Sequence, residues 1–102
     1  MLMAGAKFNL GRTYLTRGVN DLVAESLPFA KFVTSSLKRH AAGDWGNVCY
    51  EDRSANEEAL GAGNRLFSGY EEAGQPKIWI ITEAIGDDGC RASTTILFPD
   101  EY

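Results

Sequence analysis

The last third of the chain carries the clearest hydrophobic pattern, in which apolar and β-branched residues form three short runs. The runs cover residues 65–70, 77–83 and 92–98, and they are rich in residues that suit a half-buried pleated surface. The intervening segments 72–76 and 86–89 contain glycine together with proline or aspartate, which set the dihedral angles of turns. The pattern therefore predicts two consecutive antiparallel β-hairpins.

Centring each turn between its strands predicts a register and two faces. The predicted pairs are Glu83 with Arg91, Trp79 with Thr95, Arg65 with Glu83, and Phe67 with Ile81. Since side chains alternate between the faces of a strand, each face receives its own set. One face is predicted to carry Leu66, Ser68, Tyr70, Ile78, Ile80, Thr82, Thr94, Ile96 and Phe98. The opposite face is predicted to carry Arg65, Phe67, Trp79, Ile81, Glu83, Arg91, Ser93, Thr95 and Leu97.

The part of the chain before the hairpins predicts one short strand and a first helix. Alternating Phe8 and Leu10 indicate a strand within residues 7–15, at an edge of the same sheet. Thr16 has the character of an N-cap for a helix over residues 17–25.

Two further helices follow. Pro28 suits the first turn of the second helix, and Gly43 is its natural terminator. The apolar face of this helix contains Phe29, Phe32, Val33, Ser36, Leu37 and His40 at spacings of three or four. The third helix is expected to begin after Asp52 or Ser54 and to end at residues 61–63.

These elements predict an α+β fold, with three helices packed on one face of an antiparallel sheet of three or four strands. The 102 residues suit one domain, 1–102. The core is expected to contain Phe29, Phe32, Val33, Leu37, Ile78, Ile80, Ile96 and Phe98.

Composition and charge narrow the function only slightly. The net charge of -4 argues against a nucleic-acid partner, because a phosphate-binding surface needs clustered Lys and Arg. Cys49 and Cys90 have no CxxC spacing, which argues against a zinc site. Residues 1–6 lack the basic start and apolar length of a signal peptide, and no run is long enough to cross a membrane. We therefore expect a cytoplasmic protein with reduced thiols and no membrane partner.

Three groups of residues could carry chemistry. His40 and Asp44 could form an acid–base pair, or His40 could simply cap its helix. Trp45, between two glycines, could anchor a loop in the core or stack on a flat ligand. The predicted row of Arg65, Glu83 and Arg91 has two interpretations.

As a structural network, Glu83 would bridge both arginines of this row. As a site, the two arginines with Trp79, Ser93 and Thr95 would bind an anion such as a phosphate or carboxylate. The sequence contains no phosphate-binding glycine loop, no GxSxG elbow and no carboxylate cluster with metal-ligand spacing, so no cofactor is expected.

Several segments carry a resemblance to a known family. They are Phe8-Asn9-Leu10-Gly11, His40-Ala41-Ala42-Gly43-Asp44-Trp45-Gly46, Lys77-Ile78-Trp79-Ile80-Ile81-Thr82-Glu83 and Thr94-Thr95-Ile96-Leu97-Phe98-Pro99-Asp100-Glu101-Tyr102. With these segments the chain resembles a family of small uncharacterised bacterial proteins of plasmids, integrative elements and prophages. In that family a tight turn with an Asp-Arg pair joins the last two strands, whereas segment 84–90 is longer here. The resemblance implies an accessory role in a mobile element and no particular activity.

Three functions remain open at this point. The first is a non-catalytic binding module for a host protein or complex, with counter-defence as one role. The second is a protein that binds a small anionic, nucleotide-like ligand through Arg65, Arg91, Trp79 and Trp45. The third and weakest is a small hydrolase that uses His40 with Asp44 or Glu83. A homodimer is compatible with each of them.

Overall fold

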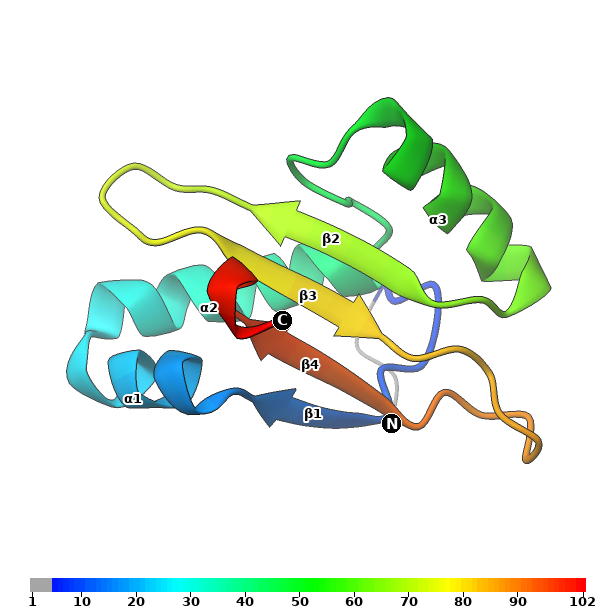
Figure 1. The fold of residues 1–102 in the computed structure, drawn as a ribbon, viewed down its shortest axis with the longest axis horizontal. Helices are drawn as coiled ribbons and strands as arrows, with labels where there is room; N and C mark the ends of the chain where they lie inside the picture. The colour runs from blue at the N-terminus through cyan, green and yellow to red at the C-terminus, as the bar shows by residue number, and fades with distance from the viewer. Residues whose placement is uncertain (1–4) are drawn as a thin grey trace.

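The computed structural model describes residues 5–102. The prediction that residues 1–6 do not form a signal peptide therefore lies mostly outside the described residues. The chain forms an α+β fold of three helices and a four-stranded sheet (Figure 1). In chain order the elements are β1 Arg12–Leu15, α1 Arg17–Glu25, α2 Leu27–Ala41, α3 Tyr50–Ala62, β2 Leu66–Tyr70, β3 Ile78–Thr82, β4 Ser93–Leu97 and the short 3-10 helix η1 Pro99–Glu101.

The sheet is mixed, which corrects the prediction of a purely antiparallel one. Its strand order is β1-β4-β3-β2, and the two predicted hairpins β2–β3 and β3–β4 are antiparallel. Strand β1 lies at the edge as expected, but it runs parallel to β4. A parallel pair needs a long crossover connection, and here the three α-helices and two strands lie between β1 and β4 in the chain.

The register of the first hairpin is as predicted, with Phe67 opposite Ile81. In the second hairpin, Trp79 lies opposite Leu97 and not opposite Thr95, and the backbone N–H of Glu83 donates to Ser93 O. The predicted pairing was therefore wrong by two residues. Because successive side chains of a strand point to opposite faces, a shift of two residues keeps each paired residue on its predicted face.

The predicted apolar face of the sheet is buried beneath α1 and α2, and we call it the inner face. Residues of α2 and of the three hairpin strands form the main core cluster, together with Val19 from α1. This cluster contains Val19, Phe29, Phe32, Val33, Tyr70, Ile78, Ile80 and Ile96. Leu37 and Phe98, also predicted for the core, are partly buried and pack against it.

Helix α3 packs against β2, and the segment that precedes α3 closes the outer edge of that strand (Figure 1). The Asn56 side chain donates to Phe67 O at 2.7 Å and accepts from Phe67 N at 3.0 Å, as a neighbouring strand would. Asn47 N donates to Gly69 O, and Gly69 N donates to Trp45 O. These hydrogen bonds occupy the backbone groups of Phe67 and Gly69, and they cover the edge of β2 that does not pair with β3.

The helix boundaries agree with the sequence for α1 and α2 and differ for α3. Helix α1 covers the predicted residues, and the Ser26 hydroxyl caps α2 by accepting from Phe29 N. Helix α3 begins at Tyr50 with Cys49 as its N-cap, so the prediction of an N-cap at Asp52 or Ser54 was wrong. Cys49 makes no side-chain cap hydrogen bond, and the segment therefore lacks the polar capping signal on which the prediction depended.

The opposite face of the sheet, which we call the outer face, is turned toward the viewer in Figure 1. Among residues 5–102, η1 and the residues that follow β4 cross this face. Glu101 fixes this crossing. Its carboxylate accepts from the Thr16 hydroxyl at 2.5 Å and from Gly18 N at 3.0 Å. Glu101 thus caps the start of α1 from the far end of the chain. Thr16 occupies the predicted N-cap position, but its own side chain makes no capping hydrogen bond.

Candidate functional site

The eight predicted site residues are divided among three places in the fold. Arg65, Trp79, Glu83 and Thr95 belong to the outer face. His40, Trp45 and Arg91 are buried on the other side, and Asp44 lies on the surface of the loop that follows α2. The structure therefore separates the residues that the ligand-binding hypothesis joined.

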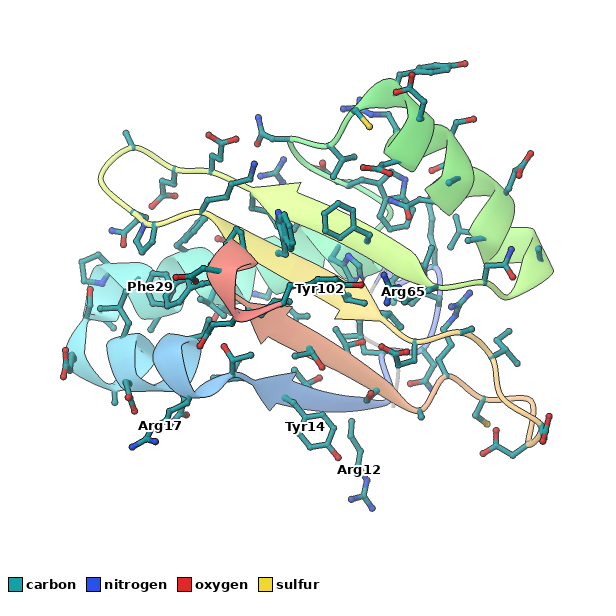
Figure 2. The ribbon with its side chains drawn as sticks, in the orientation of Figure 1. Arg12, Tyr14, Arg17, Phe29, Arg65 and Tyr102 are labelled. Carbon is teal, nitrogen blue, oxygen red and sulfur yellow. The ribbon has the colours of Figure 1, made fainter. Side chains whose placement is uncertain are left out.

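A cluster of aromatic side chains lies on the outer face around one arginine, and we call it the outer-face cluster. It consists of Arg65, Phe67, Trp79 and Tyr102. The Trp79 ring packs edge-on against Phe67 at 5.2 Å between centroids and against Tyr102 at 5.9 Å. Arg65 donates to the Tyr102 hydroxyl at 2.9 Å, and Figure 2 shows these two side chains beside each other above the sheet.

Two small hollows flank Tyr102, and both are lined by Arg65, Ile81 and Tyr102. The first, of about 250 Å³, also contains Trp79 and Phe67 and has Asp52 at its margin. The second has about 240 Å³ and is completed by Thr16, Glu83, Thr95, Leu97 and Glu101. Tyr102 lines both hollows and is 71% exposed, and its contacts with Arg65 and Trp79 hold it in place.

The predicted row of Arg65, Glu83 and Arg91 does not form. Within residues 5–102 no ion pair joins Glu83 to either arginine, and Arg65 is bonded to Tyr102 instead. Arg91 is only 6% exposed and does not lie on the outer face. Strand β4 begins at Ser93, so Arg91 precedes the regular alternation on which its predicted facing depended.

Arg91 is a structural residue that ties α3 to the end of the sheet. Its guanidinium donates to three backbone carbonyl oxygens, those of Asn64, Glu83 and Ala59, at 2.7, 3.0 and 3.1 Å. It also lies 5.8 Å from the centre of the Phe8 ring. Ala59 O belongs to the last turn of α3, where the helix dipole favours a cation. Burial lowers the pKa of Arg91 from its usual value.

His40 belongs to a buried chain of hydrogen bonds whose direction can be derived. Thr94 has one hydroxyl proton and donates it to Leu10 O at 2.6 Å, so Thr94 Oγ1 must accept from Thr82 at 2.7 Å. Thr82 Oγ1 must then accept from His40 Nε2 at 2.9 Å. When His40 is neutral, its Nδ1 is left as the acceptor for the Ser68 hydroxyl at 2.5 Å. The chain thus places the proton of neutral His40 on Nε2.

The environment of His40 agrees with this neutral form. Its side chain is completely buried, and burial, followed by the nearby positive charge of Arg91, lowers the pKa of His40 from 6.5 to about 3. Both ring nitrogens are occupied, and no face of the ring is open to a substrate. The geometry therefore gives no support to a hydrolase that uses His40.

Trp45 is a core anchor and not a stacking platform. It is 3% exposed, stacks on Phe8 at 6.2 Å and meets the edge of the His40 ring at 5.8 Å. Its indole N–H donates to Glu57 in α3 at 2.6 Å. Trp45 therefore links the loop after α2 with α3 and with the second core cluster, which includes Ala59 and Leu66.

Asp44 pairs with Arg39 and not with His40. Arg39 donates to both carboxylate oxygens, from Nε at 2.7 Å and from a terminal nitrogen at 3.1 Å. The hydrogen bond from Arg39 is the main reason why the pKa of Asp44 lies below its usual value. Asp44 also accepts from Gly46 N, so its role is to shape the turn. The predicted acid–base pair is absent because Asp44 points to the surface while His40 points into the core.

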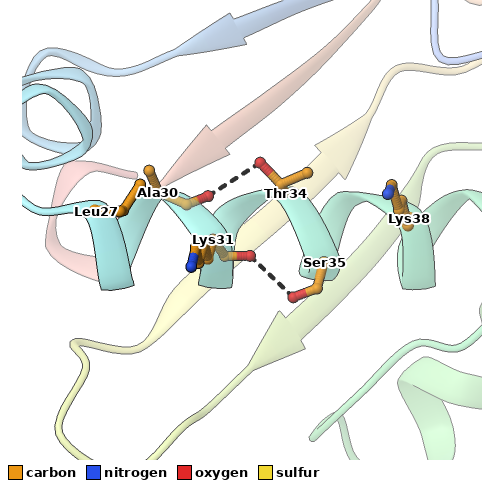
Figure 3. A pocket seen from close by; sticks show the side chains of 6 residues that line it. All are labelled: Leu27, Ala30, Lys31, Thr34, Ser35 and Lys38. Carbon is orange, nitrogen blue, oxygen red and sulfur yellow. Dashed lines mark hydrogen bonds between the residues drawn. The ribbon is translucent and has the colours of Figure 1, made fainter.

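A larger hollow lies elsewhere, on the solvent side of α2, and has about 460 Å³ (Figure 3). All of its lining comes from one helix: Leu27, Ala30, Lys31, Thr34, Ser35 and Lys38. The two hydroxyls bond to carbonyls of their own helix, Thr34 to Ala30 and Ser35 to Lys31. No polar groups converge on the space from different elements, so the hollow lacks the arrangement of a binding site.

The described part of the chain shows neither a candidate metal site nor a candidate membrane-spanning helix. Among residues 5–102, no group of three His, Cys, Asp or Glu side chains comes together in a way that could hold a metal ion. No helix within these residues has the length and apolar character needed to cross a membrane.

The sequence interpretation missed Tyr102, Ser68, Thr82 and Thr94. For the last three a signal existed, because all of them were predicted on the buried face, where a hydroxyl needs a partner. The one histidine of α2 also faces the core, and this makes it the obvious partner. For Tyr102 there was no signal, since its position depends on how Glu101 fixes the segment after β4.

Comparison with protein-family models, curated proteins and solved structures gives no match to this chain.

Proposed function

We propose that the protein is a non-catalytic binding module that engages a partner protein through the outer-face cluster. The observation that carries this proposal is the grouping of Trp79, Tyr102, Phe67 and Arg65 on a sheet face that η1 covers only in part. Tryptophan, tyrosine and arginine are the residues that most often dominate the binding energy of protein interfaces.

The two hollows indicate the chemistry of the partner. Their apolar walls include Ile81, Leu97 and the rings of Trp79 and Phe67, and Arg65 lies between them as an exposed donor. This combination suits a protein segment with an apolar side chain next to a carboxylate or carbonyl oxygen. Displacement of Tyr102 would join the hollows and would release the Arg65 guanidinium for the partner.

The setting of this role comes from the resemblance to proteins of mobile elements. In that setting the partner is a host protein or complex, and counter-defence is one use of such binding. Cys49 and Cys90 are both free thiols, which supports a place in the cytoplasm. The fully occupied His40 also supports a role in binding and not in catalysis.

A second candidate is the binding of a small planar anion, such as a nucleotide. It is favoured by the first hollow, which contains both Arg65 and Trp79. However, its volume of about 250 Å³ is smaller than most small-molecule sites, which have about 300–1,000 Å³. Arg91, the second cation that this hypothesis requires, donates to three backbone carbonyls outside the hollow. A protein partner is therefore the better-supported proposal.

Quantitative capture from a bacterial host lysate can test the proposal if variants are compared side by side. The protein, its Trp79→Ala variant and its Arg65→Ala variant are used as baits, and Tyr50→Ala is the matched control. Tyr50 is 80% exposed on α3, outside the outer-face cluster. We expect one protein to bind the parent and Tyr50→Ala, and to lose affinity for the other two variants by about 30-fold, as is typical of central interface residues.

Two results would contradict the proposal. One is a partner that binds the Trp79→Ala and Arg65→Ala variants as tightly as the parent. The other is the release of a nucleotide from the denatured parent, with no protein partner and with loss of the nucleotide in Arg65→Ala. The second result would establish the small-ligand alternative.

A further inference from the structure

The two edges of the sheet differ in how they are covered. At the β2 edge, Asn56 and the segment 45–47 occupy the free backbone groups. At the β1 edge, no backbone or side-chain group within residues 5–102 is bonded to the outer side of the strand. Uncovered edges are where further strands add to a sheet, so the β1 edge is the open position for pairing in this fold.

The β1–β4 ladder shows which groups of β1 are free. Arg12 N donates to Ala92 O at 3.1 Å, and Thr16 N donates to Ile96 O at 3.0 Å. Because the direction of backbone groups alternates along a strand, Arg12, Tyr14 and Thr16 face β4. The N–H and C=O groups of Thr13 and Leu15 therefore point away from the sheet.

We propose that β1 pairs with β1 of a second copy of this chain, antiparallel and about a two-fold axis at Tyr14. Only residues with outward backbone groups can form a hydrogen-bonded pair, so Thr13 of each copy lies opposite Leu15 of the other. The two pairs exchange both of their N–H and C=O groups. The two Tyr14 rings, each 50% exposed in one copy, then face each other across the axis (Figure 2 shows Tyr14 and Arg12 projecting from β1).

Charge complementarity favours a second copy as the occupant. In this register Arg12 of one copy lies opposite Thr16 of the other. The Thr16 hydroxyl donates to the Glu101 carboxylate at 2.5 Å, so that carboxylate stands where Arg12 arrives. Arg12, Tyr14 and Thr16 share the outer face with Glu101, and the symmetry produces the ion pair twice. Within residues 5–102 of a single copy, Arg12 has no acidic partner.

The pairing has a consequence for the outer face. An antiparallel edge pair has its two-fold axis perpendicular to the sheet, so both copies turn their outer faces to the same side. The dimer would present two outer-face clusters on one continuous sheet of eight strands. If the proposed partner is itself multivalent, this arrangement strengthens its binding without any new contact.

Sedimentation velocity of the full chain, over protein concentrations of about 1 µM to about 1 mM, tests the pairing in the range of weak association. We expect the mass to rise from 11.1 kDa toward twice that value. Thr13→Pro removes an outward N–H without touching the ladder to β4 and should give a monomer. Arg12→Glu should weaken the dimer about 10-fold, since it reverses two exposed ion pairs. Tyr50→Ala is the control and should leave the dimer unchanged.

A charge series at Arg12 keeps the test decisive if Thr13→Pro does not fold. Arg12→Glu should weaken the dimer, and Arg12→Lys, which keeps the positive charge, should largely preserve it. A mass of 11.1 kDa over the whole concentration range would overturn the proposal, whether or not a strand from another protein binds the edge. A dimer that withstands Thr13→Pro, or one that is insensitive to Arg12→Glu, would also overturn it.

Discussion

The Nε2 atom of His40 lies 2.9 Å from the hydroxyl oxygen of Thr82, and this contact joins α2 to the middle of the sheet. It is one step in a chain of donors that ends at Leu10 O, before β1. The chain connects five segments of the sequence, at Leu10, His40, Ser68, Thr82 and Thr94. Within residues 5–102 no buried side-chain polar atom lacks a hydrogen-bond partner. A satisfied network of this kind favours one arrangement of the core over its alternatives.

The first prediction concerns the tautomer of His40. Because Thr94 donates to Leu10 O, the direction of every other bond in the chain follows, and His40 must carry its proton on Nε2. Long-range ¹H–¹⁵N correlation of the imidazole at neutral pH should show a protonated Nε2 and an unprotonated Nδ1. The same spectrum in denaturant should show rapid averaging between the tautomers. A proton on Nδ1 in the folded protein would contradict the derived direction.

The second prediction is a loss of stability in mild acid. The folded pKa of His40, about 3, lies below its usual value of 6.5, so protonation favours the unfolded chain. This contribution is fully present above pH 6.5 and is lost as the pH falls toward 3. The free energy of unfolding should decrease by about 1.4 kcal/mol per pH unit through this window. Urea denaturation at a series of pH values measures it.

The matched control for this prediction is His40→Gln, which retains a polar side chain but has no group that titrates in this window. Asp44 and Glu101 also have lowered pKa values and act in the same direction, but they titrate only below the usual carboxylate range. Between about pH 6.5 and pH 4.5, the dependence on pH should therefore be much smaller in His40→Gln. Equal dependence in both proteins would assign the effect to other groups.

Much of the fold could be predicted because the signals were periodic. The inner face of the sheet was assigned from alternation alone, and even a two-residue slip between Trp79 and its partner preserved that assignment. Helix α2 was defined by Pro28 and by its apolar face. The direction of β1 was not predictable, because an edge strand has the same hydrophobic pattern whether it is parallel or antiparallel.

The candidate site was predicted only in part, for related reasons. Arg65 and Trp79 lie inside regular strands or beside them, and alternation placed both on the outer face. Arg91 lies before the start of β4, outside the regular alternation of the strand. The position of its side chain depends on carbonyl groups of α3 and of the loop after α3. Tyr102 depends on a contact across the whole chain, between Glu101 and the start of α1. Such long-range contacts leave no local pattern in a sequence.

The third prediction concerns the closed edge of β2. Asn56 is 3% exposed and bonds to both backbone groups of Phe67. Asn56→Ala leaves these two groups without partners in a buried position, and we expect a loss of about 2–4 kcal/mol in the free energy of unfolding. Asn47→Ala is the control: the side chain is exposed, only its backbone is bonded to β2, and a change within about 0.5 kcal/mol is expected. A loss below about 1 kcal/mol for Asn56→Ala would show that α3 does not replace a strand at this edge.

The last prediction compares two glycines that have opposite surroundings. Gly46 has φ +72°, and a Cβ there would overlap Gly69 O and the ring of Tyr70. Gly46→Ala therefore combines backbone strain with overpacking, and we expect a loss of more than about 3 kcal/mol. Gly61 lies in α3 with nothing within 4 Å of an added Cβ. Gly61→Ala should stabilise the protein by about 0.5–1 kcal/mol.

Thermal and urea unfolding of the two variants beside the parent protein separates general glycine effects from the local contact. If both substitutions act only through the unfolded chain, they should shift stability in the same direction by similar amounts. The positive φ of Gly46 alone would cost an alanine about 1–2 kcal/mol. A loss of more than about 3 kcal/mol would therefore show that the segment 45–47 lies directly against β2. A loss below about 1 kcal/mol for Gly46→Ala would mean that this segment can move away from Gly69 without disturbing the sheet.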